Sequence, residues 1–197
     1  MMRFDLAGYL IFAFVTAITP GPNNYMLFTH GKNFGFTDAR KLMAGIFFGF
    51  LVMLYISGYG MSELLLKNNT VGFILKIISS IWLLYLAFVL SNLSSENSSN
   101  SISSIGFYKA FFMQFINPKA WIMAITGAAA FRPSLGNMHL NVSVFAFIFG
   151  LVGIPCMIIW IKFGDLITTW IKSERLNKAI GITIFFLMVS SVIMIWI

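Results

Sequence analysis

Apolar residues fill six stretches of about 20 residues each, and polar segments separate them. A helix of about 20 apolar residues is long enough to cross the hydrocarbon core of a bilayer. The pattern therefore predicts an all-α integral membrane protein with six transmembrane helices and the lipid bilayer as its surroundings. The predicted spans are Leu6–Phe28, Leu42–Leu64, Val71–Leu90, Phe107–Ala128, Val142–Phe163 and Leu176–Ile197.

Two prolines interrupt the first stretch, in the sequence Thr19-Pro20-Gly21-Pro22-Asn23-Asn24. Each proline lacks a backbone donor and clashes with the preceding helical turn. A membrane helix tolerates such a break only where protein or a water-filled cavity satisfies the freed backbone groups. The motif therefore predicts a cavity at membrane depth, which is where secondary transporters bind their substrates.

The two halves of the chain resemble each other. Gly8 and Pro20 are as far apart as Gly106 and Pro118, and each half contributes three spans. Because three is odd, the second copy enters the membrane from the opposite side. The sequence predicts two inverted three-helix repeats with broken first helices, a pattern typical of secondary transporters.

A single transporter domain, residues 1–197, is expected to contain both repeats. Its halves cover about 1–92 and 105–197, and the segment Ser91–Ser104, rich in Ser and Asn, is expected to be a flexible loop between them. A chain of this size offers little protein around a cavity, which makes a homodimer an open possibility.

Composition and charge support a membrane location. Of the 197 residues 59% are hydrophobic and only 10% are charged, whereas soluble domains carry roughly 25% charged residues. The formal charge of +7 is concentrated between the apolar stretches, and no motif for a nucleic-acid partner is present. Because the odd-numbered connections hold more Lys and Arg, the positive-inside rule predicts that both termini are periplasmic.

The first break is a candidate substrate-binding site. The helix that restarts there exposes backbone N–H groups and the positive end of its dipole, which favour a carboxylate. Asparagine amides at this point would be unfavourable against lipid. An alternative is a kink near the cytoplasmic interface, with the asparagines capping the span. The candidate residues are Pro20, Gly21, Pro22, Asn23 and Asn24.

A second candidate lies in the fourth span, at Asn117, Pro118 and Lys119. Lys119 would lie about 18 Å from the start of the span, near the membrane midplane. A lysine at that depth costs about 3 kcal/mol unless it faces a cavity. It is therefore predicted to meet a substrate carboxylate or to change protonation during transport. The alternative is a lysine that extends to the interface.

Other positions carry weaker signals. Gly45 and Gly49 have the small-xxx-small spacing of close helix packing, although glycine is common in membrane helices. No acidic residue falls in the middle of a span, which favours a neutral substrate. The titratable residues that remain for ion coupling lie near span ends and are His30, Asp38, Glu63 and Asp165.

No catalytic constellation, metal-ligand spacing or nucleotide-binding loop is found. We therefore expect neither an enzyme nor a cofactor or metal site. A chain without a nucleotide motif cannot itself use ATP, so transport would depend on an ion gradient.

Three motifs together resemble the LysE/RhtB amino-acid exporters along essentially the whole chain. They are Ala17–Asn24 with Gly31, Gly35 and Leu42–Gly49; Phe115–Lys119; and Arg175–Asn177 leading to Gly181. Asn23-Asn24, Arg40–Val52 and Phe112–Asn117 are most similar to the cysteine/O-acetylserine branch. Where many members carry an acidic residue after the second-span glycines, this chain has Phe50 and Leu51.

The resemblance implies export of a small amino acid or derivative across a bacterial inner membrane against proton entry. The residues by themselves leave two other functions open. One is a non-transporting membrane scaffold or accessory subunit, in which Lys119 pairs with a partner chain. The other is a channel-like pore for a small solute.

Overall fold

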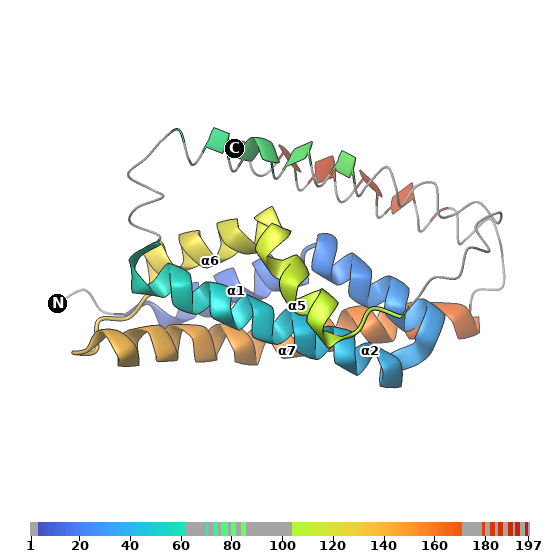
Figure 1. The fold of residues 1–197 in the computed structure, drawn as a ribbon, viewed down its shortest axis with the longest axis horizontal. Coiled ribbons are helices and arrows are strands. Elements are labelled where there is room, and N and C mark those ends of the chain that lie inside the picture. Colours follow the sequence, from blue (N-terminus) through green and yellow to red (C-terminus); the bar gives the residue numbers. More distant parts are fainter. Residues whose placement is uncertain are drawn as a thin grey trace.

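The computed structural model describes residues 4–61 and 104–170, together with scattered positions within 70–85 and 179–196. All regular structure in this part of the chain is helical, which confirms the all-α prediction (Figure 1). The predicted third and sixth spans lie mostly outside the described residues. The elements are α1 (Leu6–Ile18), α2 (Pro22–Ile56), the π-helix η1 (Ser57–Met61), α5 (Phe107–Ile116), α6 (Pro118–Phe131) and α7 (Met138–Trp170).

Two of these helices are apolar and long enough to cross a membrane, and they cover Pro22–Gly60 and Met138–Ile167. The first contains a turn at Gly35, whose φ of 74° and ψ of 174° are non-helical. Apart from this turn, the backbone stays helical from Pro22 to Ile56 and so continues beyond the predicted span end at Phe28. The predicted connection at residues 29–41 contains no proline that would end the helix, and glycine adopts the conformation of the turn at low cost.

Both predicted break positions separate two helices. α1 ends at Ile18 and α2 begins at Pro22, while α5 ends at Ile116 and α6 begins at Pro118. Proline suits the first helical position because its missing N–H would have no intrahelical partner there. Figure 1 shows α1 and the α5–α6 pair running in opposite directions along the long axis.

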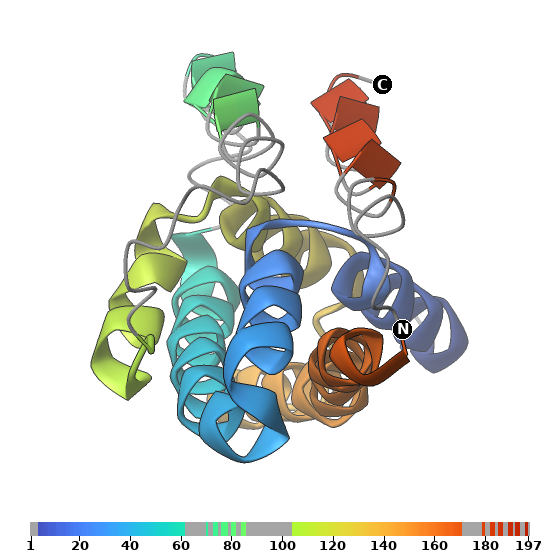
Figure 2. The same ribbon diagram turned by 90° about the vertical axis from the view of Figure 1, so that its right-hand side faces the viewer.

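The helices surround a core in which α2 makes its most extensive contacts with α7 and then with α5 (Figure 2). Tyr9 of α1 is fully buried, stacks on Phe131 and Phe145, and donates a hydrogen bond of 2.7 Å to the Phe145 carbonyl. This buried hydroxyl pairs with a helix backbone rather than with water, so it ties α1 to α7.

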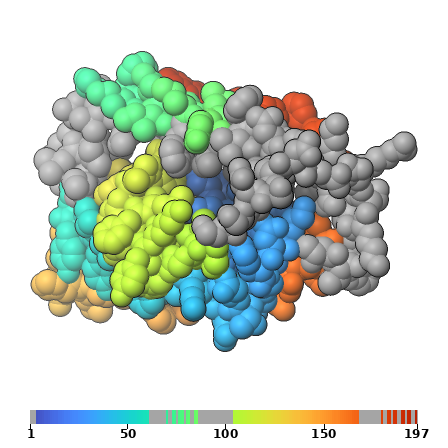
Figure 3. Space-filling view, turned by 45° about the vertical axis from the view of Figure 1, so that its right-hand side comes forward, coloured from blue at the N-terminus to red at the C-terminus, as the bar shows by residue number. Residues whose placement is uncertain are grey.

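The described residues of 70–85 and 179–196 lie over one side of this bundle (Figure 3). Trp196 links the two segments, because its Nε1 donates to Ser80 Oγ over 2.8 Å and its ring meets Phe73 edge to face. Positions from the predicted third and sixth spans therefore lie side by side.

Glycines allow the backbone of α2 to lie close to the backbones of neighbouring helices. A Cβ added at Gly49 would lie 2.6 Å from the Phe111 carbonyl oxygen of α5, and one at Gly45 would collide with the Phe107 carbonyl. On α7, a Cβ at Gly164 would collide with the Phe28 carbonyl oxygen. Small residues at these crossings permit backbone contacts that a side chain would prevent.

Candidate functional site

The two breaks meet inside the bundle through three amide side chains. Asn23 Nδ2 donates to Gln114 Oε1 over 2.7 Å, and Gln114 Nε2 donates back to Asn23 Oδ1 over 3.1 Å. Asn117 Nδ2 donates to the same Asn23 oxygen over 3.1 Å. Buried amides need such partners, so these contacts hold the start of α2 against the junction of α5 and α6.

Lys119 bridges the breaks a second time. Its Nζ donates to the Thr19 carbonyl oxygen and to Thr19 Oγ1, both over 2.9 Å, and to the Pro20 carbonyl oxygen over 2.8 Å. These oxygens follow the C-terminal end of α1, where the helix dipole favours a cation. Gly21 makes room for this contact, because a Cβ there would lie 2.8 Å from Lys119 Cδ.

Side chains also pair with the last carbonyl groups of α1. Asn24 Nδ2 donates to the Ala17 and Thr19 carbonyls over 2.7 and 2.8 Å, and Trp160 Nε1 of α7 donates to the Ile18 carbonyl over 3.0 Å. Asn24 thus caps the preceding helix from across the break. The end of α1 satisfies its free oxygens through protein donors, as a break at membrane depth requires.

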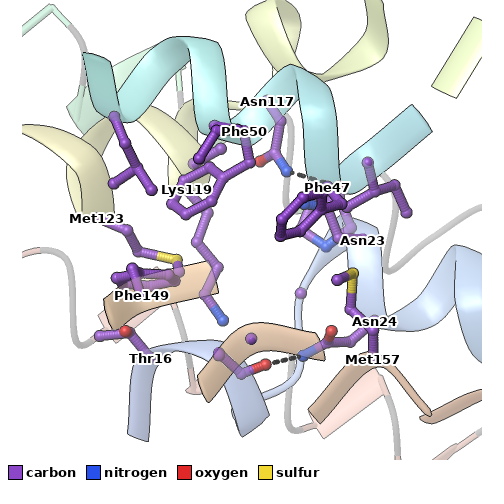
Figure 4. Close-up of a pocket in the computed structure, with 18 of the residues that line it drawn as sticks. Thr16, Asn23, Asn24, Phe47, Phe50, Asn117, Lys119, Met123, Phe149 and Met157 are labelled. Carbon is purple, nitrogen blue, oxygen red and sulfur yellow. Dashed lines mark hydrogen bonds between the residues drawn. The ribbon is translucent and has the colours of Figure 1, made fainter. Parts of the chain in front are cut away.

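A cavity lies between α1, α2, α6 and α7 beside these contacts, with a volume of about 640 Å³ that includes the open space at its mouth (Figure 4). We call Asn23, Asn24, Asn117 and Lys119 its polar lining. Its apolar lining consists of Ile46, Phe47, Phe50, Leu51, Leu54, Met123, Phe149 and Met157.

One acceptor of the polar lining has no hydrogen-bond donor among the described residues. Asn117 is only 4% exposed, and no donor in the described part of the chain lies within hydrogen-bonding distance of its Oδ1. An unpaired buried acceptor costs about 1–3 kcal/mol. Asn117 lines the cavity, but the Oδ1 atom itself has almost no exposed surface, so an N–H group of a bound molecule would reach it only after the side chain rotates.

The structure brings most of the predicted site residues together. Four of them form the polar lining, and Gly21 and Pro22 also line the cavity, while Pro118 opens α6 next to Lys119. Gly45 and Gly49 instead face α5.

Sequence reasoning missed two groups of residues. Gln114 is fully buried at the meeting point of the breaks, and a lone amide in an apolar stretch was a signal that could have found it. The aromatic and Met side chains of the apolar lining gave no such signal, because in the sequence they cannot be told from residues that face lipid or the core.

Of the titratable residues near the span ends, His30, Asp38 and Asp165 are not among the residues that line the cavity. His30, which is 3% exposed, contacts Asp38 Oδ2 through Nε2 at 2.9 Å, across the Gly35 turn. Ser104 Oγ donates to the same carboxylate oxygen over 2.7 Å. Glu63 is outside the described residues, and in the described part no cluster of His, Cys, Asp or Glu could hold a metal ion.

Apolar helices that break at two points around a cavity are typical of membrane transport proteins. Residues 14–195 match the family described as LysE type translocator, and the chain belongs to this family. It is therefore a transporter and not an enzyme.

Two similar proteins are the cysteine/O-acetylserine efflux proteins of Salmonella typhi, 25% identical over 154 residues, and of Escherichia coli (strain K12), 26% identical over 155 residues. Each alignment covers 77% of this chain and 79% of the relative. No solved structure matches the chain.

Proposed function

We propose that this protein is a secondary transporter that exports a small neutral amino acid or a derivative across the bacterial inner membrane. The observation that carries the proposal is the cavity at the meeting point of two helix breaks, where Asn23, Asn24, Asn117 and Lys119 line it. Relatives named for cysteine and O-acetylserine efflux support the same class of substrate.

The polar lining suits the two charged groups that all amino acids share. Asn23 and Asn24 belong to the first turn of α2, whose backbone N–H groups and dipole favour an anion. The substrate carboxylate binds there, and Lys119 neutralises it while its ammonium group stays bound to the oxygens at the end of α1. The substrate ammonium group donates to Asn117 Oδ1.

In this proposal residues 1–197 form one domain of two inverted three-helix repeats, about 1–92 and 105–197. The opposite directions of α1 and the α5–α6 pair, and the matching helix ends at Ile18 and Ile116, support the repeat. Both termini are periplasmic, and two copies form a homodimer. Reaction of cysteines placed at either terminus with an impermeant reagent, in a Cys156→Ala background, tests the orientation.

Transport is coupled to proton entry. The His30–Asp38 pair supplies a titratable group at the turn that joins the two halves of α2. In proteoliposomes, an acidic interior should then drive uptake of substrate against its gradient. Uptake that does not depend on the pH gradient but depends on the gradient of another ion would reject proton coupling and leave the export function unaffected.

Counterflow in proteoliposomes tests the function itself. Vesicles preloaded with unlabelled cysteine, O-acetylserine, homoserine, threonine, leucine or lysine receive the matching labelled compound outside. We expect saturable exchange of at least one neutral amino acid and none of lysine, because no acidic residue is among the described residues that line the cavity. Non-saturating flux would identify a pore instead, and absence of exchange from folded protein would reject the transport proposal.

Replacing Asn117 tests how the substrate is bound. In Asn117→Ala the acceptor for the substrate ammonium group is lost, so we expect the KM for exchange to rise about tenfold, the equivalent of about 1.4 kcal/mol. The matched control is Asn33→Ala, because Asn33 is exposed on α2 and its loss should leave the KM unchanged. An unchanged KM in Asn117→Ala would remove this residue from the binding site.

A further inference from the structure

A chain of amide groups joins the two breaks, and hydrogen-bond chemistry fixes its orientation. The Ala110 carbonyl oxygen can only accept, so the Gln114 atom that lies 3.1 Å from it is the amide nitrogen. Gln114 Oε1 then accepts from Asn23 Nδ2, which leaves Asn23 Oδ1 to accept from Gln114 Nε2 and from Asn117 Nδ2 (Figure 4). The nitrogen of Asn117 is therefore bound to Asn23, and its oxygen is left outside the chain of amides.

Asn117 also occupies the N-cap position of α6, where its oxygen has another use. A side-chain oxygen at this position accepts a hydrogen bond from an N–H group of the first helical turn. The oxygens of Asp5 and Asn137 cap α1 and α7 in this way, over 2.9 and 2.7 Å. Asn117 makes no such bond to α6, so its contact with Asn23 takes the place of a cap.

This position of the Asn117 side chain leaves two sets of groups unsatisfied. Its Oδ1 is buried without a donor among the described residues, and the first turn of α6 has no side-chain cap in the described part of the chain. Buried polar groups normally have partners. One rotation of the side chain, away from Asn23 and toward the first turn of α6, would satisfy the oxygen and the helix together.

We propose that Asn117 is a two-position switch between the halves of the chain. It bridges to Asn23 in the conformation of this structure, and it caps α6 in a second conformation in which the two breaks have separated. The switch rests on the proposed export function, because separation of the halves is the movement that alternating access requires. Since an amide oxygen has two lone pairs, it can cap α6 and still accept from a bound molecule.

Serine and alanine at position 117 separate the two roles. The serine hydroxyl caps helices well, but it lies one bond closer to the backbone than the asparagine amide and cannot replace the bridge to Asn23. Alanine provides neither contact. The ratio of the second conformation to the first should therefore be about fivefold higher in Asn117→Ser than in Asn117→Ala, the equivalent of a cap of about 1 kcal/mol.

Distances between two spin labels, measured by pulsed electron paramagnetic resonance, report the two conformations. The labels are attached to Phe14→Cys on α1 and Phe112→Cys on α5, which are exposed, in a Cys156→Ala background that removes the single native cysteine. The matched control is the same pair of substitutions at Asn137, which caps α7 at an exposed position. Asn137→Ser and Asn137→Ala should leave the distance distribution as it is in the wild type.

The variant Asn23→Ala tests the switch from the other side of the bridge. It removes the acceptor of the bridge and leaves Asn117 able to cap α6, so the ratio of the second conformation to the first should rise at least about fivefold over the wild type. An unchanged distribution in Asn23→Ala would overturn the switch.

The remaining outcomes separate the switch from the export function. Equal ratios in Asn117→Ser and Asn117→Ala, or one distance in every variant, would overturn the switch while counterflow could still establish export. A distribution that shifts as expected in a protein that exchanges no amino acid would support the switch and reject export.

Discussion

Replacement of Lys119 by alanine should reduce exchange at least about a hundredfold while the protein still inserts and folds. The Lys119 ammonium group donates to three oxygens at the end of α1, from the other half of the chain. The Thr19 carbonyl keeps a donor in this variant, because Asn24 Nδ2 also donates to it, but all three bonds from the ammonium group are lost. Hydrogen bonds from a charged group contribute about 1.5–3 kcal/mol each, so loss of the three that Lys119 makes should raise the free energy of the state with both breaks in contact by about 3 kcal/mol or more, which is a factor of about a hundred.

The proposed substrate complex suffers a second loss in this variant, because the bound carboxylate would lack its counter-charge in a cavity with few polar groups. Counterflow with the best wild-type substrate gives the rate, and gel filtration in detergent reports folding. Lys109→Ala is the matched control, because Lys109 is exposed on α5. This variant should exchange substrate at the wild-type rate.

Two outcomes would contradict this expectation. Near wild-type exchange by Lys119→Ala would remove the residue from the transport mechanism. Failure of Lys119→Ala to fold would show that the lysine is needed for assembly of the breaks, and its role in transport would then have to be tested by Lys119→Arg, which keeps the charge but changes the donor geometry.

Gly164→Ala should destabilise the folded bundle by on the order of 3 kcal/mol, although it adds a single methyl group. A Cβ at Gly164 would collide with the Phe28 carbonyl oxygen and lie 2.9 Å from the Lys32 backbone nitrogen. Close by, a Cβ at Gly31 would collide with the Ile161 carbonyl oxygen. Because all these neighbours are backbone atoms, only a separation of α2 from α7 could relieve the contact.

Thermal unfolding in detergent, followed by circular dichroism or by loss of monodisperse protein, measures this effect. Gly153→Ala is the control on the same helix, because its added Cβ would make only an ordinary contact at 4.0 Å and alanine favours helix more than glycine does. Its melting temperature should equal or exceed that of the wild type. A Gly164→Ala protein as stable as Gly153→Ala would mean that α2 and α7 do not cross at this point.

The sequence determined the features that depend on local chemistry. Long apolar stretches require helices in a membrane, and prolines at Pro22 and Pro118 start new helices wherever the chain goes afterwards. The class of transporter also follows from sequence, through the matching family. The sequence predicted a connection between the first two spans around Gly35, but not that the chain stays helical on both sides of this residue and turns at it alone.

Only the tertiary structure decided what the break residues contact. Lys119 and Thr19 are 100 positions apart, and no local pattern states that the ammonium group of one lies against the oxygens of the other. The same holds for Asn23 with Gln114, for the apolar lining of the cavity, and for the crossing at Gly164. Hydrogen bonds and close contacts between distant segments depend on how whole helices pack, whereas helix formation and helix breaking depend on neighbours along the chain.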